Sequence, residues 1–225
     1  MSAPRLAVVL MLAVAFVSSP ASSQAPGSSN PSADSRPTSR PYTGDLSIFE
    51  YPDRDKKLQV DRVMDLLGIK AGKNVADIGA GSGWFTVRAS RRVGPTGTVL
   101  AEDINPLAIE SIGKRATKEN LPNIRTVLGR PDDPMLPPES VDAVLLLKVY
   151  HEIAHPVDFM KKLAPALRSG AKLGIIDKNG DGSNHGVGHE VVEREMAQAG
   201  FRLSATYDFT KADGQDYFMI FEANR

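Results

Sequence analysis

The glycines between residues 75 and 85, in the run VADIGAGSGWF, have a spacing that could serve ligand binding. The apolar run Asn74–Ile78 is too short for a helix and is followed by glycines, so it predicts a buried strand with a helix starting at Trp84. A dinucleotide site needs the spacing G-x-G-x-x-G, whose third glycine allows close approach of a pyrophosphate. Here the third position is Trp84, whose indole would obstruct a pyrophosphate. The spacing therefore favours a ligand without phosphates.

Acidic residues follow the next two predicted strands. The run Thr98–Asp103 ends on a carboxylate, and Ile124–Leu128 is followed by GRPDDP. The glycine loop and these acids resemble the motifs of the class I S-adenosylmethionine-dependent methyltransferases. The element order and a terminal hairpin resemble their seven-stranded sheet over about residues 55–222.

This resemblance implies S-adenosylmethionine as the cofactor and a role for each matching residue. Asp77 would accept a hydrogen bond from the cofactor's ammonium group, directly or through water, and Asp103 would receive both ribose hydroxyls. Either Asp132 or Asp133 would bind the adenine amino group. The cofactor-binding residues expected are Asp77, Gly79, Gly81, Asp103, Asp132, Asp133 and Lys148. The bland alternative is that Asp77 and Asp103 only cap the elements that follow them.

The methyl acceptor is expected beside the segment LLKVYHEIAHP, which follows the predicted central strand Val141–Leu147. Transfer needs an acceptor in line with the methyl group at about 3–3.5 Å, and a base only if the acceptor carries a proton. We take His151 and Tyr150, two polar side chains of this segment, as the catalytic candidates. His151 is the natural base, because an imidazole ordinarily titrates near neutral pH. The alternative is that His151 only bonds to backbone at the end of the strand.

The residues His151 to His155 spell H-E-x-x-H, the pattern of zinc proteases. That chemistry needs both histidines on one helix face, and Pro156 biases His155 away from helical geometry. A zinc hydrolase is therefore kept only as a minor alternative.

The run Asp177 to Gly182 spells D-x-N-x-D-G, the first half of a calcium loop, but its twelfth position is Gly188 instead of glutamate. We predict no metal ligand here and leave calcium binding by this run open.

Strand and helix patterns alternate along the chain, which predicts a parallel sheet covered by helices on both faces. We expect a three-layer αβα sandwich with a Rossmann-like sheet of seven strands, the last one antiparallel. The remaining expected strands are Lys172–Ile176, Arg202–Phe209 and Gln215–Glu222. The expected helices are Asp53–Leu67, Trp84–Val93, Pro106–Asn120, Pro156–Leu167 and His189–Ala199.

The N-terminus differs from the rest of the chain. Arg5, an apolar run over residues 6–17 and a small-residue tail are typical of a secretory signal peptide, which we place at residues 1–25. The Ser/Pro-rich stretch 26–41 predicts a disordered linker, and residues 42–225 would form the methyltransferase domain. The protein would then be exported, with membrane attachment only through an uncleaved N-terminus, or cytoplasmic if the start codon is wrongly assigned.

Composition limits the kinds of partner and chemistry expected. The 27 basic and 27 acidic residues balance, so the chain has no net positive charge that would attract nucleic acid. The absence of cysteine excludes thiol chemistry. We expect an enzyme that methylates a small molecule. The main alternative is an exported, non-catalytic binding protein with the same fold. The oligomeric state and the acceptor stay open.

Overall fold

The computed structural model describes residues 1, 38, 42, 44–181 and 184–224. The chain divides into two units, Met1–Pro31 and Ser32–Arg225, and the fold reported below is that of the second. Apart from Met1 and Thr38, the predicted signal peptide and linker lie outside the described residues.

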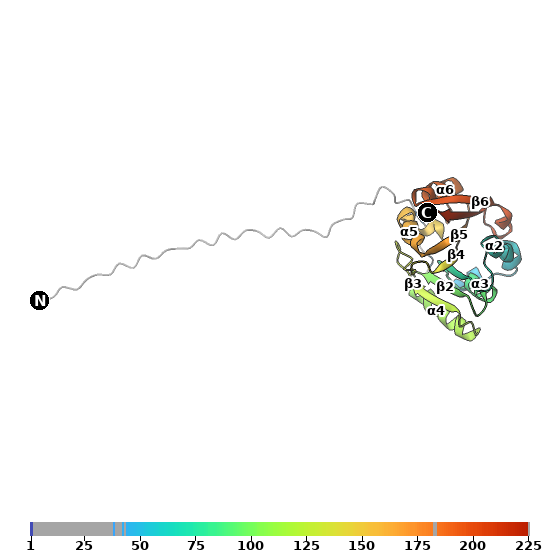
Figure 1. Cartoon of the computed structure of the whole chain (residues 1–225), viewed down its shortest axis with the longest axis horizontal. Coiled ribbons are helices and arrows are strands. Elements are labelled where there is room, and N and C mark those ends of the chain that lie inside the picture. The colour runs from blue at the N-terminus through green and yellow to red at the C-terminus, as the bar shows by residue number, and fades with distance from the viewer. Residues whose placement is uncertain (2–37, 39–41, 43, 182–183, 225) are drawn as a thin grey trace. The chain divides into compact units, whose positions relative to one another are not determined.

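A seven-stranded sheet forms the centre of the described part of the chain (Figure 1). Its strands, listed here with their bounds, are β1 (Asn74–Ile78), β2 (Thr98–Asp103), β3 (Ile124–Leu128), β4 (Val141–Leu147), β5 (Leu167–Asp177), β6 (Phe201–Tyr207) and β7 (Tyr217–Ala223). Their spatial order is β3-β2-β1-β4-β5-β7-β6. Neighbours from β3 to β5 pair in parallel, whereas β7 is antiparallel to both β5 and β6. The expected seven-stranded sheet with an antiparallel last strand is confirmed.

Six α-helices of the described residues flank this sheet. They are α1 (Arg54–Leu58), α2 (Val60–Leu66), α3 (Trp84–Val93), α4 (Pro106–Lys118), α5 (Pro156–Leu163) and α6 (His189–Gln198). Short 3-10 turns complete the list: η1 (Leu46–Phe49), η2 (Tyr150–Glu152), η3 (Ala164–Ala166) and η4 (Phe209–Asp213).

Alternation along the central strands creates the three layers, because successive side chains of a strand point to opposite faces. In β4, Val144 and Leu146 pack with α5 and α6, while Ala143 and Leu145 pack with α2 and α3 on the other face. All four side chains are buried. The small apolar contact of α4 with Ala101 lies on the α3 side, because Val99, two residues earlier in β2, belongs to the cluster that contains α3.

Two helix predictions are corrected. The single helix expected over Asp53–Leu67 is broken at Gln59, whose φ of +53° is left-handed. The break lets Leu58 and Val60 both be buried, and the Gln59 amide donates to the carbonyl of Phe209 at 3.2 Å.

The helix expected over Pro156–Leu167 ends at Leu163, and β5 starts at Leu167 instead of Lys172. Pro165 lies in the intervening turn, where its missing N–H prevents a regular continuation of the helix. The other helices and strands match their predicted ranges to within two residues.

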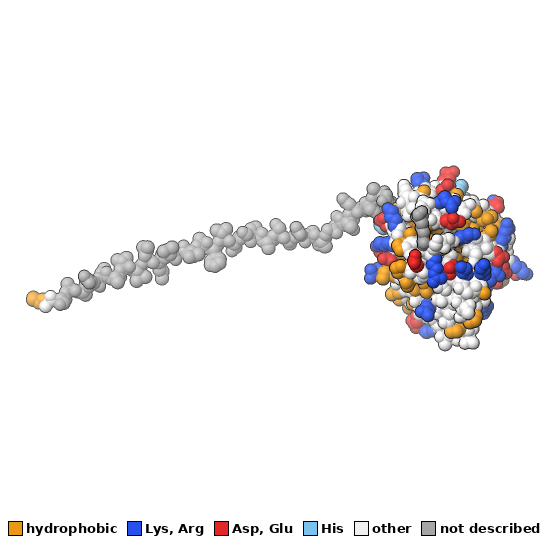
Figure 2. Space-filling view, viewed as in Figure 1, with side chains coloured by type: hydrophobic (Ala, Val, Ile, Leu, Met, Phe, Trp, Pro, Cys, Tyr) orange, Lys and Arg blue, Asp and Glu red, His pale blue; other side chains and the backbone are white. Residues whose placement is uncertain are grey.

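The surface of the described part carries mixed charge. In the face seen in Figure 2, Lys/Arg and Asp/Glu side chains both appear without separating into one basic or acidic half. Within the described ranges, every helix is too short or too polar to span a bilayer.

Candidate functional site

The site lies at the carboxyl ends of β1 and β4, the neighbouring strands whose following helices pack on opposite faces of the sheet. After β1 the chain enters α3 on one face, and after the neighbouring β4 it enters α5 on the other face. Loops that diverge in this way leave a crevice at the carboxyl ends of the strands, which is where open α/β sheets bind ligands. A cavity of about 620 Å³ occupies this position, and loops after β1, β2, β3 and β4 line it.

The glycine loop after β1 forms the floor of the cavity. Gly79 has φ of +65°, and a Cβ at this position would lie 2.4 Å from Cγ2 of Val149. Gly81 has φ of +54°, and its N–H donates to Oδ2 of Asp103 at 2.8 Å. Glycine is therefore needed at position 79 for both conformation and space, and the loop from β1 is tied to the acid that ends β2.

Two of the predicted acids meet at this loop. Asp77 is buried and accepts a hydrogen bond of 2.6 Å from the hydroxyl of Thr86 on α3. Burial raises the pKa of Asp77 to about 7. Asp103 also accepts from the backbone N–H of Asn105 at 2.8 Å, and burial raises its pKa above the usual range.

Glu102 is a site residue that the sequence reading missed. Its Oε2 accepts from the N–H of Gly79 at 3.3 Å, while its buried Oε1 has no hydrogen-bond partner among the described residues. Burial raises the pKa of this carboxyl to about 8. A Cβ on Gly129 would lie 1.7 Å from Oε1, so glycine after β3 makes room for the carboxyl group. The available signal was the acidic residue directly before Asp103 at the end of the strand.

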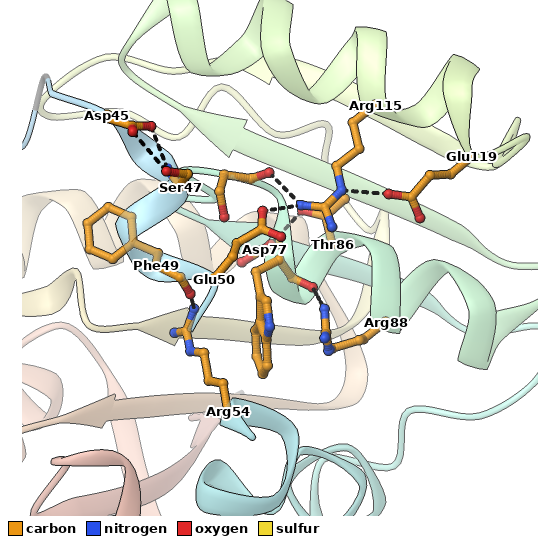
Figure 3. A network of polar contacts seen from close by, with 12 residues as sticks. Asp45, Ser47, Phe49, Glu50, Arg54, Asp77, Thr86, Arg88, Arg115 and Glu119 are labelled. Atoms are coloured by element: carbon orange, nitrogen blue, oxygen red, sulfur yellow. Dashed lines mark hydrogen bonds and ion pairs between the residues drawn. The ribbon is translucent and has the colours of Figure 1, made fainter. Parts of the chain in front are cut away.

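An N-terminal segment forms a further wall. Leu46 and Phe49 of η1 line the cavity, and Asp45 caps the start of η1, its carboxylate accepting from the N–H of Ser47 at 2.9 Å. Figure 3 shows Arg115 of α4 reaching across to Glu50, at the end of η1.

Arg115 also fastens this wall to the glycine loop. Its guanidinium donates to the carbonyl of Ser82 at 3.1 Å and to Glu119 at 2.8 Å. Arg54 of α1 also holds η1 in place, because its guanidinium donates to the carbonyl of Phe49 at 2.6 Å (Figure 3).

Trp84, the residue in the third glycine position, is buried and lines the cavity. The guanidinium carbons of Arg54 and Arg88 lie 4.1 Å and 4.0 Å from the centre of its ring. Such cation–π contacts hold the indole at the start of α3.

The structure brings five of the seven expected cofactor residues to the cavity wall: Asp77, Gly79, Gly81, Asp103 and Lys148. Lys148 is partly buried, has φ of +62°, and its pKa is lowered by burial.

The two acids expected at the adenine do not line the cavity. Asp132 is exposed and pairs with Lys162 at 2.5 Å, and Asp133 accepts from the N–H of Met135 at 2.8 Å. The neighbouring Arg130 and Pro131 line the cavity instead. The geometry thus gives no support to an adenine contact by either aspartate.

The acceptor segment is also arranged differently from the expectation. Tyr150 is fully buried and its hydroxyl donates to Glu195 at 2.9 Å, away from the cavity wall. His151 is buried, with Nδ1 lying 2.9 Å from both carboxylate oxygens of Asp177. Of the polar groups on this segment, Lys148 and Glu152 are the ones that line the cavity. Burial raises the pKa of Glu152 to about 7.

The H-E-x-x-H pattern lacks the geometry that a zinc-protease site requires. The H-E-x-x-H letters fall on the three-residue turn η2 and continue into non-helical backbone at His155 (φ −123°, ψ 68°). The two histidines therefore do not share a helix face, and the zinc-protease arrangement is absent from this described segment. In the run Asp177 to Gly182, the first carboxylate is directed to His151, and Gly182 lies outside the described residues.

Comparison with known proteins agrees with this geometry. Residues 75–170 match the model of the family described as a methyltransferase domain. The ubiquinone/menaquinone biosynthesis C-methyltransferase UbiE of Pseudomonas fluorescens is 27% identical over 115 residues, which are 51% of this chain and 45% of that protein. The nocamycin O-methyltransferase of Saccharothrix syringae is 34% identical over 83 residues, 37% of this chain and 30% of that protein. The chain thus spans less than half the length of either relative.

Among solved structures, a SAM-dependent methyltransferase from Aquifex aeolicus superposes with a TM-score of 0.71 at 22% identity, covering 78% of this chain and 95% of that one. At this identity the superposition shows a shared fold. Residues 75–170 are therefore similar to the methyltransferase-domain family, and the chain has the Rossmann-like fold seen in S-adenosylmethionine-dependent methyltransferases.

Proposed function

We propose that the cavity binds S-adenosylmethionine and that the protein transfers its methyl group to a small molecule. The observation that carries this proposal is the acidic group around the glycine loop, in which Asp77, Glu102 and Asp103 line one cavity. Burial raises the pKa of all three carboxyl groups, so each would gain from a cationic ligand. A sulfonium compound with a free amino group supplies two positive charges and no phosphate.

The chain's own groups account for each part of this donor. The unpartnered Oε1 of Glu102 and the carboxylate of Asp103 are acceptors suited to a ribose diol, and Asp77 is suited to the ammonium group. Gly83, the N-cap of α3, has no side chain to cap the helix, so the first N–H groups of α3 suit the donor's carboxylate. The apolar side chains of Leu46 and Phe49 would exclude water from the bound donor.

The transfer step needs little covalent chemistry from the protein. The bond from the methyl carbon to sulfur breaks, its electron pair stays on sulfur, and a bond from the acceptor to that carbon forms. The acceptor side of the cavity is lined by Lys148, Glu152 and Phe159. Its size suits a small acceptor, and the balanced charge of the chain offers no general attraction for nucleic acid.

An isotope-transfer assay tests the proposal. The full chain is incubated with donor labelled in its methyl group and a small-molecule extract, and label in non-protein, non-donor compounds is counted. We expect label to accumulate with the wild type and to fall to background with Asp103→Ala. Binding of S-adenosylhomocysteine without any transfer would instead support the alternative of a non-catalytic binding protein with this fold.

We also propose that residues 1–25 direct the chain to export, on the grounds of the basic residue and apolar run described above. The full chain fused to a reporter that is active only outside the cytoplasm should give signal, and deletion of residues 2–25 should abolish it. Equal signal from both would overturn this part of the proposal.

A further inference from the structure

Three side chains beside the cavity carry metal-ligating atoms close to one another. His151, Glu152 and His185 each place one ligand atom within 4.8 Å of the other two. The rings of the two histidines are 5.7 Å apart at an interplanar angle of 86°, and Nε2 of His151 lies 3.9 Å from Oε1 of Glu152. The residues come from two segments far apart in sequence, the turn η2 and the loop after β5.

We propose that these three residues form a binding site for a divalent transition-metal ion of the zinc class. Two imidazoles and one carboxylate are a ligand set that suits Zn²⁺, Fe²⁺ or Co²⁺, whereas Mg²⁺ and Ca²⁺ prefer oxygen ligands throughout. Three protein ligands leave a coordination position open for water or a substrate, as in catalytic zinc sites.

The distances allow this site to close around an ion. Tetrahedral zinc with bonds of about 2.0–2.1 Å places its ligands about 3.4 Å apart, so separations of up to 4.8 Å must close by up to about 1.4 Å. His185 is exposed, and rotation of its side chain can supply that shift.

The ring nitrogen of His151 that would not bind the ion, Nδ1, already has the carboxylate partner that is usual for a metal-binding histidine. Its Nδ1 lies 2.9 Å from both oxygens of Asp177, which is fully buried at the end of β5. Asp177 also accepts from the backbone N–H groups of His151 at 3.2 Å and Lys178 at 2.9 Å. A carboxylate on one ring nitrogen places the proton there and leaves Nε2 as the basic atom, which is the usual outer arrangement of metal-bound histidine.

Glu152 connects this site to the cavity. Its side chain lines the cavity, and its Oε1 lies 3.9 Å from Nε2 of His151. An ion bound by Glu152 would therefore face the acceptor side of the cavity.

This arrangement is distinct from the H-E-x-x-H pattern in the sequence. In zinc proteases both histidines of the pattern are ligands and the glutamate is the base. Here Glu152 would itself be a ligand, and the second histidine would be His185 instead of His155.

Metal titration of the full chain tests the site. Protein stripped with a chelator is titrated with Zn²⁺ by calorimetry and with Co²⁺ by visible absorption, and Ca²⁺ is run in parallel. We expect one Zn²⁺ per chain and a Co²⁺ spectrum with nitrogen ligands. His185→Ala and Glu152→Gln should each raise the Kd for Zn²⁺ about tenfold or more, and Asp177→Asn by about 10–100-fold. The matched control is His189→Ala, a nearby imidazole outside the cluster that contacts Asn179.

Three results would overturn the proposal: no saturable binding of Zn²⁺ or Co²⁺ by the wild type, equal affinity in His185→Ala, or an equal loss in His189→Ala. Saturation by Ca²⁺ alone would assign the region to calcium and also contradict it. Binding of S-adenosylhomocysteine by the metal-stripped protein is measured in the same samples. The donor pocket and the metal site can therefore fail independently of each other.

Discussion

At the scale of single residues, the buried carboxyl of Glu102 should make the stability of the fold depend on pH. Its carboxyl is buried, and Oε1 has no partner among the described residues. Burial raises the pKa of Glu102 from an ordinary value of 4.5 to about 8. Between these two values the folded chain holds a proton that the unfolded chain has released. The free energy of unfolding should therefore decrease as pH rises from about 5 to 8.

Glu102→Gln should flatten this dependence, because the amide does not titrate. Asp77, with a pKa raised to about 7, acts in the same direction, so the slope should shrink without vanishing. Denaturant unfolding of ligand-free protein at pH 5, 6, 7 and 8 measures both slopes. An unchanged slope in the variant would mean that Glu102 is ionised in the fold.

Gly79 is the second residue with a specific requirement. In Gly79→Ala, the left-handed φ of +65° and the contact with Val149 each add a cost of about 1–3 kcal/mol. We expect the free energy of unfolding to fall by about 2–5 kcal/mol, measured by denaturant titration. A change below about 1 kcal/mol would show that the loop adapts without holding this conformation.

The sequence predicted the residues that sit directly on strand ends better than those in longer loops. Asp77 and Asp103 belong to strand ends, whose position follows from the apolar runs before them. Asp132 and Asp133 sit in an irregular loop, where periodicity carries no information and a salt bridge to Lys162 decides the orientation of the first. The position of His185 could not be predicted from the sequence, because its neighbours in space, His151 and Glu152, come from another segment.

At the scale of elements, the strands were predictable because each is a short apolar run bounded by turn residues. The β1, β2, β3 and β4 ranges match the prediction at both ends. The break at Gln59 was not predictable, since the apolar spacing on both sides continues through it and the contact with Phe209 is 150 residues away.

Helix α4 contains a glycine, Gly113, that its surroundings do not require. Gly113 lies in its interior with open space around the position of a Cβ and without a left-handed φ. Gly113→Ala should therefore stabilise the protein by about 0.5–1 kcal/mol through helix propensity. It also serves as the matched control for Gly79→Ala, because the same chemical change has the opposite sign there. Destabilisation would indicate that another group packs against this face of α4.

At the scale of the whole molecule, the cavity depends on parts that the sequence order does not bring together. The sheet supplies the loops after β1 and β2, while η1 closes one side through the contacts of Arg115 and Arg54 (Figure 3). The alternation of strands and helices predicted a parallel sheet covered by helices. The wall formed by η1 has no periodic pattern, so only the tertiary contacts reveal it.

The most direct test of the account is calorimetric titration of the full chain with S-adenosylhomocysteine. We predict saturable binding of one molecule per chain, weakened about 10–100-fold by Asp103→Ala or Asp103→Asn, because each variant loses a charged hydrogen-bond acceptor. Asp132→Ala, which alters an exposed acid outside the cavity wall, should bind like the wild type. Absence of binding by the wild type, or equal affinity in the Asp103 variants, would contradict the assignment of this cavity to the methyl donor.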